Sequence, residues 1–393
     1  MVRIVQKYGG TSVKDIDCIL SVANKIKEFY VQGNEMIVVV SARAGVTDRL
    51  IADAKKLSVT PNGRELDVLL CTGEQETVAL LSIALDAIGV QATSMLAFQI
   101  GLQTCSSHGN ARIKNIHGAN VEKLLVEKNV VIVAGFQGIS EDGDLTTIGR
   151  GGSDLTALAL AHRFHADRCE IYTDVNGVYT GNPRIIQNAK LIEEIDFESL
   201  LWLSFFDNKI MQDRSIAFAQ KNDISFTISH TLGNSTGTRV TTTTKHYESC
   251  IVGITSKTNL CLVSCKSNED VICKILTFFE DHGVAIGFVK HRHFDGDTFF
   301  DEISLDMLDF ASLSGKFSEK FRPYFLDLHT VENLSRIDIV GTNMQSNPKI
   351  FQIFDIIPQQ DILRSEYGKH GLSFLIKPEN YKNLLNQIHD LVF

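Results

Sequence analysis

The sequence contains no apolar stretch of the length that a membrane span requires. Its apolar runs, such as residues 36–40 and 130–134, fall far short of the roughly 18 residues expected for a spanning helix. The first seven residues also lack the apolar core of a secretion signal. We therefore expect a cytoplasmic protein without a membrane partner, in which these short runs form buried strands.

An excess of positive charge and a cysteine framework are missing as well. The formal net charge is -9 at pH 7, which argues against a general affinity for nucleic acid or anionic membranes. A ligand that carries phosphate would need a local basic cleft. The eight cysteines are scattered through the chain, which predicts reduced thiols rather than disulfides. Cys261 and Cys265, the closest pair, lack a second pair at zinc-finger spacing and are expected to pack in a strand.

The sequence does contain enough apolar material for a substantial core in two or three domains. Of its 393 residues, 44% are hydrophobic and 22% are charged, as in soluble globular proteins. From residue 1 to about 245, short apolar runs alternate with helical patterns, which predicts an α/β domain. We expect an open, mostly parallel sheet with helices on both faces and ligands at the carboxyl ends of its strands.

The pattern changes after about residue 246. Residues 246–325 and 326–393 each follow a shorter alternation of strands and helices. This alternation predicts two α+β units of the βαββαβ type, with helices on one face of a small sheet. Two interpretations of these units stay open, namely a packing or oligomerisation module and a sensor of an amino acid.

Two glycine turns that lead into helices are candidate anion sites. Residues 7–12 follow the first expected strand, where glycine N–H groups, a helix N-terminus and Lys7 favour a negative ligand. Such a turn is weak support on its own, because ordinary turns also contain glycine pairs. Residues 146–154 are more specific, because three glycines accompany Arg150, which can grip a carboxylate with two parallel hydrogen bonds. Ser153 either meets a ligand there or caps the helix.

Residues 172–184 form a third cluster of ligand-binding residue types after another expected strand. Tyr179 offers a flat face for a base, Arg184 offers charge for phosphate, and Asp174 offers an oxygen for a ribose. The alternative is a turn rich in glycine, asparagine and proline whose polar groups bond only to one another.

These turns belong to a longer series of seven segments, which are residues 7–12, 41–48, 72–74, 108–112, 134–138, 146–154 and 172–184. In this order they resemble the motif series of the aspartate kinases in the amino-acid kinase family. The two C-terminal units resemble, with weaker motifs, the paired ACT domains of the same enzymes. The resemblance implies phosphorylation of the side-chain carboxylate of L-aspartate by ATP and Mg2+, for lysine, threonine and methionine biosynthesis. It also implies a homodimer or higher homo-oligomer that associates through the ACT-like units.

The resemblance also implies roles for individual residues. Lys7 and Gly10 would contact the transferring phosphoryl group, and Asp154 would hold the catalytic cations in place. Glu74 would face the amino group of aspartate, and Arg150 would face a carboxylate. The full aspartate set would be Thr47, Glu74, Arg150, Gly151 and Ser153. The ATP set would be Lys7, Gly9, Gly10, Ser12, Thr173, Asp174, Tyr179, Arg184 and Lys209. Magnesium would rest chiefly on phosphates and water, so we name no protein ligand.

The chemistry of this reaction suits these residues. An aspartate carboxylate, with a pKa of about 3.9, is already ionised at pH 7 and needs no general base. This explains why no histidine lies in the glycine loops. The protein has to overcome the repulsion between two anions and to align them. Lys7, Arg150 and the N–H groups of the loops are suited to that task.

The sequence departs from the aspartate kinases in several places, which include Asn176 and Asn182 in the ATP loop and residues 344–348 in the second ACT-like unit. Two departures matter most. The small residues that usually precede Lys209 are replaced by Asp207 and Asn208. In the first ACT-like unit, residues 266–269 and 290–293 include charged side chains where small and amide residues surround an effector. Such side chains would fill the effector site or leave their charges unpaired, so we expect little feedback regulation. The two histidines of the second segment lack a further metal ligand at defined spacing and are interpreted as surface residues.

These departures leave two alternatives open. One is a divergent amino-acid kinase that phosphorylates another small carboxylate or an amine in a specialised pathway. Glu74 and Arg150 favour an amino acid with a further carboxylate as its substrate. The other alternative is a non-catalytic regulatory relative, which would have no need of Lys7, Asp154 and Asp174 together.

Overall fold

The computed structural model describes residues 2–206, 210–233, 235–242, 251–294, 298–342, 344, 347–377, 379 and 381–393. The chain forms two compact units. The first comprises Met1–Tyr179 and Leu191–His246, and the second comprises Thr180–Lys190 and Tyr247–Phe393. Domain boundaries at 245/246 and 325/326 stay predictions.

The first unit is built on an eight-stranded sheet with the order β10-β12-β11-β9-β1-β2-β6-β3. All neighbouring pairs are parallel except β11 and β12. Its strands are β1 (Arg3–Tyr8), β2 (Glu35–Val40), β3 (Ala92–Met95), β6 (Val130–Ala134), β9 (Arg168–Thr173), β10 (Glu194–Asp196), β11 (Phe226–His230) and β12 (Thr238–Thr241). A second sheet has the order β5-β4-β7-β8, with β4 (Leu102–Thr104), β5 (Ile113–Ile116), β7 (Gln137–Ile139) and β8 (Leu145–Thr147).

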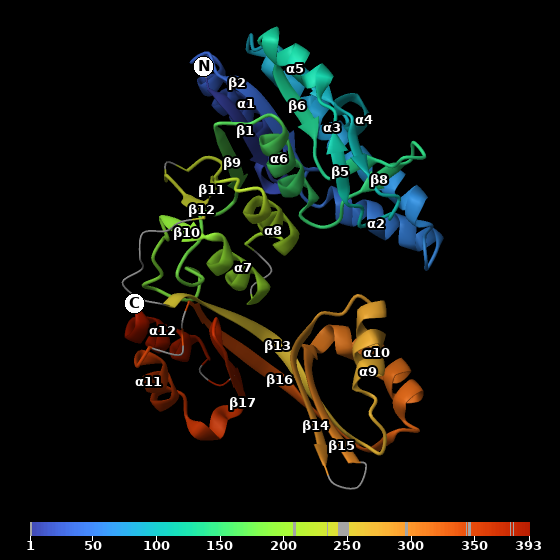
Figure 1. The fold of residues 1–393 in the computed structure, drawn as a ribbon, viewed down its shortest axis with the longest axis vertical. Coiled ribbons are helices and arrows are strands. Elements are labelled where there is room, and N and C mark those ends of the chain that lie inside the picture. The colour runs from blue at the N-terminus through green and yellow to red at the C-terminus, as the bar shows by residue number, and fades with distance from the viewer. Residues whose placement is uncertain are drawn as a thin grey trace. The chain divides into compact units, whose positions relative to one another are not determined.

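Helices cover both faces of the large sheet, so the predicted α/β fold is confirmed (Figure 1). One face packs on α1 and α3, through side chains such as Val38 of β2 and Ile132 of β6. The other face packs on α6. The helices are η1 (Gly10–Val13, a 3-10 helix), α1 (Ile16–Tyr30), α2 (Val46–Leu57), α3 (Gly63–Ala87), α4 (Ala97–Ile100), α5 (Ala119–Val126), α6 (Gly152–Arg163), α7 (Phe197–Phe206) and α8 (Asp213–Lys221). Because both faces are covered, β6 is buried along its whole length and reads as an unbroken apolar run.

Helix α3 is the one helix of the described chain that is long and apolar enough, by length and composition alone, to cross a membrane. Half of its most apolar window is nevertheless buried inside the protein. The buried positions include two carboxylates, Asp67 and Glu74, which accept hydrogen bonds from loops of the first unit. In this fold α3 is therefore a core helix that packs against α1 and the sheet.

The second unit is built on one antiparallel sheet with the order β14-β15-β13-β16-β18-β17. Its elements are β13 (Ile251–Ser267), α9 (Ile272–Asp281), β14 (Ile286–Phe294), β15 (Thr298–Asp306), α10 (Met307–Phe321), β16 (Phe325–Gly341), α11 (Lys349–Ile356), η3 (Gln359–Asp361), β17 (Ile362–Tyr367), β18 (Gly371–Ile376) and α12 (Tyr381–Val392). Val263 and Cys265 at the end of β13 pack with α9 and α10, whereas Ile251 and Ile254 at its start pack with α11 and α12. The long strands β13 and β16 thus serve two cores of the predicted α+β type.

The last residues of the 172–184 cluster belong to the second unit, as part of the segment 180–190. At the start of this segment, Oγ1 of Thr180 lies 2.8 Å from Nε2 of His389 in α12. Ile186 is buried in the same core as α11 and α12. Asn386 of α12 also donates to the carbonyl oxygen of Ile185 at 3.0 Å. Part of the segment predicted to bind ATP is therefore folded on the C-terminal helix.

Candidate active site

The loops that follow β1, β2, β6 and β9 lie side by side, because these neighbouring parallel strands end at the same edge of the sheet. Backbone hydrogen bonds run from the first residue of a loop to the end of the neighbouring strand. Gly9 donates to the Tyr172 carbonyl at 3.2 Å, Ser41 to that of Tyr8 at 3.1 Å, and Gly135 to that of Val40 at 3.0 Å. The sheet thereby brings four of the seven motif segments to one edge.

Lys7 and Asp154 form a close ion pair at this edge. Lys7 is only 8% exposed, and its Nζ lies 2.6 Å from Oδ1 of Asp154. The pairing follows from the strand alternation, because Lys7 points to the sheet face that α6 covers, while its neighbour Tyr8 points to the α1 face. Asp154 lies in the first turn of α6, where the helix dipole favours a negative charge. The two residues predicted to be catalytic are therefore adjacent.

The turn after β1 is held against the turn after β2. A Cβ atom on Gly10 would lie 2.7 Å from the carbonyl oxygen of Ala42, so only glycine fits this approach. Ala44 donates to the Gly10 carbonyl at 3.1 Å. Ser12 is buried, and its hydroxyl lies 2.6 Å from that of Thr231, which in turn donates to the Thr173 carbonyl at 3.0 Å. Thr231, which the sequence analysis did not single out, thus connects two residues predicted to bind ATP.

Glu74 is a buried carboxylate with one unpartnered oxygen. It is 3% exposed, and its Oε1 accepts a hydrogen bond from the Ala42 N–H at 3.0 Å. No described residue donates to its Oε2. Burial raises the pKa of Glu74 from 4.5 to about 7, although the Ala42 N–H partly opposes this shift. Such a carboxylate can accept a cation without first losing a protein partner.

The Arg150 loop joins β8 to α6. Gly149 has a φ of +83°, a left-handed conformation that glycine adopts without steric cost. Arg150 itself is exposed. The N-cap of α6 is Gly151, which makes no side-chain capping bond, so Ser153 does not cap this helix. Ser153 is buried instead, and packs against Gly135 in the loop after β6.

The remaining predicted residues lie at the following places. Thr47 is half-buried in the first turn of α2. Asp174 is exposed after β9 and accepts from the Thr173 hydroxyl at 3.1 Å. Tyr179 is half-buried. Arg184 is exposed in the segment that belongs to the second unit. Lys209 lies outside the described residues.

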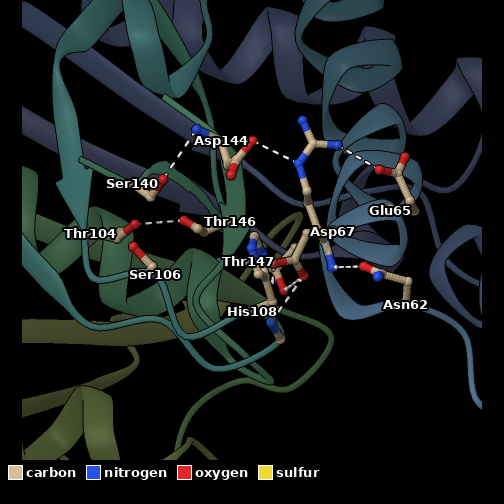
Figure 2. Close-up of polar contacts among 12 residues, drawn as sticks. Asn62, Glu65, Asp67, Thr104, Ser106, His108, Ser140, Asp144, Thr146 and Thr147 are labelled. Carbon is tan, nitrogen blue, oxygen red and sulfur yellow. Dashed lines mark hydrogen bonds and ion pairs between the residues drawn. The ribbon is translucent and has the colours of Figure 1, made fainter. Parts of the chain in front are cut away.

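Asp67 is a buried residue of this region that the sequence analysis missed. Figure 2 shows its carboxylate with His108 and Thr147 pointing toward it. His108 belongs to a segment that the resemblance included without giving it a role. The spacing of seven residues between Asp67 and Glu74, which places both on one face of α3, is the signal that could have indicated it.

Within the described residues, no group of three or more histidine, cysteine, aspartate or glutamate side chains is placed to hold a metal ion. A Mg2+ ion that enters on ATP needs only one or two carboxylates from the protein. Asp154 lies in the first turn of α6 and Asp174 directly after β9, so each offers a carboxylate of the kind that this limited requirement calls for.

Comparisons with known proteins show the family to which this chain belongs. The model of the amino acid kinase family matches residues 2–230. An aspartokinase of Geobacillus stearothermophilus is 36% identical over 373 residues, which cover 91% of this chain and 89% of that protein. The chain belongs to the aspartokinases of the amino acid kinase family. An aspartate kinase of Pseudomonas putida is 46% identical to this family member over 241 residues, 61% of the present chain and 59% of the relative.

Solved aspartokinase structures share the fold of this family member. Aspartokinase III of E. coli, in complex with aspartate and ADP, superposes with a TM-score of 0.78 at 22% identity, and all of both chains is covered. The same enzyme in complex with lysine and aspartate gives a TM-score of 0.80. The likeness extends over the ACT-like half, so the predicted fold class, an amino-acid kinase fold followed by ACT-like units, is confirmed.

Proposed function

We propose that this aspartokinase transfers the γ-phosphoryl group of ATP to the side-chain carboxylate of L-aspartate and forms 4-phospho-L-aspartate. The single observation that carries the proposal is Glu74. Its buried Oε2 faces no donor among the described residues, which is costly for a charged carboxylate unless a ligand supplies one. The ammonium group of an amino acid supplies such a donor, and the family membership points to aspartate.

The reaction requires alignment and charge neutralisation rather than proton transfer. An ionised oxygen of the aspartate side chain attacks the γ-phosphorus, the bond from that phosphorus to the β,γ-bridging oxygen breaks, and ADP leaves with the electron pair. Lys7, fixed by Asp154, stabilises negative charge on the transferring group. Arg150 binds the α-carboxylate of aspartate, and Glu74 binds its ammonium group. Thr47, Gly151 and Ser153 complete the aspartate site.

The loops after β1 and β9 bind ATP. Gly9, Gly10 and Ser12 offer the turn that receives the phosphates, and Thr173 with Asp174 lies beside it. Tyr179, Arg184 and Lys209 complete this set. When bound, Mg2+ neutralises charge on the phosphates. Asp154 and Asp174 are the carboxylates that would hold it.

The proposal also covers the oligomeric state, the cellular compartment and the pathway. The C-terminal unit serves as the surface through which the chain forms a homodimer or a higher homo-oligomer. The cysteines of the described chain are all free, which suits the reducing cytoplasm. The product supplies lysine, threonine and methionine biosynthesis.

A coupled assay tests the proposal. ADP release is followed with L-aspartate, L-glutamate and succinate, and the acyl phosphate is trapped with hydroxylamine as a hydroxamate. We expect ADP and hydroxamate in equal amounts with L-aspartate. Succinate, which has both carboxylates but no ammonium group, should be a poor substrate. Absence of both products with folded protein, Mg2+ and millimolar aspartate would contradict the proposal, and equal rates with succinate would contradict the role of Glu74.

A further inference from the structure

We propose that Asp67 is a positioning residue for the Arg150 loop and thereby for the binding of the aspartate carboxylate. This inference rests on the proposed function of that loop. Asp67 is 1% exposed and lies on α3, two helical turns before Glu74. It sits on the face of α3 that also carries Glu74, but its hydrogen bonds go to other parts of the protein.

The Asp67 carboxylate joins three segments that are distant in sequence. Its Oδ1 accepts from the Thr147 hydroxyl at 2.6 Å, and both of its oxygens lie 3.1 Å from the Gly109 N–H. Nδ1 of His108 lies 2.8 Å from Oδ2. Figure 2 shows the side chains of His108 and Thr147 pointing toward Asp67. Burial of a carboxylate is costly unless its oxygens are hydrogen-bonded, so this network fixes the geometry of α3, the 108–110 turn and the end of β8.

The fixed segments are those on which the Arg150 loop rests. Thr147 is the last residue of β8 and lies three residues before Arg150. The 109–110 turn packs directly behind Gly149, because a Cβ there would lie 3.0 Å from Oδ1 of Asn110 and 3.4 Å from the Gly109 carbonyl. Ala111 donates to the Thr147 carbonyl at 2.9 Å. A shift of Gly109 or Thr147 is therefore transmitted to the residue that precedes Arg150.

A second charged residue holds the same segments by their carbonyl groups. Arg214 of α8 donates to the carbonyl oxygen of Ile148 at 3.0 Å and to that of Ala111 at 3.1 Å. Two charged side chains thus hold the segments on which the Arg150 loop rests. Asp67 of α3 accepts from the Thr147 hydroxyl and the Gly109 N–H, and Arg214 of α8 donates to two carbonyl groups. With its base fixed in this way, Arg150 projects from a rigid turn, which reduces the entropy lost on binding a carboxylate.

Two adjacent threonines provide a matched test in the full-length protein. Thr147→Val removes the hydroxyl that Asp67 accepts, at nearly constant volume. Thr146→Val removes a hydroxyl that is equally buried but lies 2.6 Å from that of Thr104 instead. We expect Thr147→Val to raise the aspartate KM about tenfold with little change in the ATP KM, since small misplacements of binding groups have effects of this order. Thr147→Ser, which keeps the hydroxyl, should restore the aspartate KM, and Thr146→Val should leave it unchanged.

Amide hydrogen exchange supplies a readout that does not depend on activity. Exchange of residues 149–153 should be faster in Thr147→Val than in the wild type, and unaltered in Thr146→Val. If the two valine variants show the same kinetics and the same exchange, the positioning role is wrong even where wild-type aspartate kinase activity is present. If the wild type lacks that activity but the exchange differs as expected, the proposed function fails while the fixation of the loop by Asp67 stands.

Discussion

Replacement of Glu74 by glutamine should stabilise the free protein at alkaline pH and weaken aspartate binding. Burial raises the pKa of Glu74 from 4.5 to about 7. The folded state therefore binds more protons than the unfolded state between these two pH values, and stability is lost as the pH rises through this window. Glutamine keeps the shape and the acceptor for the Ala42 N–H but carries no charge.

The magnitude follows from the size of the shift. A difference of 2.5 pH units, at about 1.36 kcal/mol per unit, corresponds to about 3 kcal/mol of lost stability once Glu74 is ionised in the folded state. A rise from pH 5.5 to pH 8 passes through only the last 1.5 units of the range between pH 4.5 and about pH 7, in which this stability is lost. The stability of Glu74→Gln relative to the wild type should therefore increase by about 2 kcal/mol over this range.

Urea unfolding at pH 5.5 and pH 8 measures this difference. Glu76→Gln is the control, because Glu76 lies on the same helix but is exposed and pairs with Arg43 at 3.0 Å. Because this carboxylate is exposed, Glu76→Gln removes a charge from the same helix without the burial on which the Glu74 prediction rests. A stability difference between Glu74→Gln and the wild type that is identical at the two pH values would refute the argument from burial.

Aspartate binding should strengthen as the pH rises, whereas the stability of the free protein falls. The substrate ammonium stabilises the ionised form of Glu74, so the wild-type aspartate KM should rise up to about tenfold per unit as the pH falls below about 7. Glu74→Gln should have a KM at least tenfold higher at pH 8 and little pH dependence of this origin. A normal aspartate KM in the variant would exclude Glu74 from the substrate site.

Three further predictions concern charge and regulation. Lys7→Ala should lower kcat by about 10²–10³-fold with a modest effect on folding, and near-normal turnover in the coupled assay would remove Lys7 from the catalytic machinery. Arg150→Ala should chiefly raise the aspartate KM, and a pure loss of kcat would contradict its binding role. Lysine and threonine, singly and together at millimolar levels, should inhibit little, because an effector acts only through differential binding and His291 is already engaged 2.6 Å from buried Asp301. Strong cooperative inhibition in steady-state assays would reveal a working effector site.

The sequence predicted those features that depend on local pattern. Apolar runs such as residues 130–134 correctly indicated buried parallel strands, and the glycine turns between strands and helices indicated the sheet edge at which motif segments meet. Lys7 and Asp154 were both singled out, but their pairing depends on which sheet face α6 covers, and no local pattern encodes that. The seven-residue spacing from Glu74 places Asp67 on the same face of α3, but it does not show what Asp67 contacts, because its partners lie 41 and 80 residues away.

The extent of the C-terminal unit was also beyond local pattern. The turn residues of segment 180–190 indicated a loop but not its neighbours, because Asn386 and His389 follow about two hundred residues later. Likewise, the 17-residue strands β13 and β16 each cross two cores. Alternation within a strand shows which side chains are buried, but it does not show that the two ends of the strand pack on different helices.

The placement of residues 180–190 on α12 has a consequence for chimaeric aspartokinases. A single crossover near residue 246 would join this catalytic unit to the C-terminal half of another aspartokinase. The native segment 180–190 would stay, and its buried Ile186 would have to pack in a core that differs from its own. A swap that respects the packing needs three junctions, so that residues 180–190 travel with the C-terminal half. Since we propose that Arg184 of this segment binds ATP, recombinants that keep this catalytic unit and have one junction should lose ATP affinity before they lose aspartate affinity.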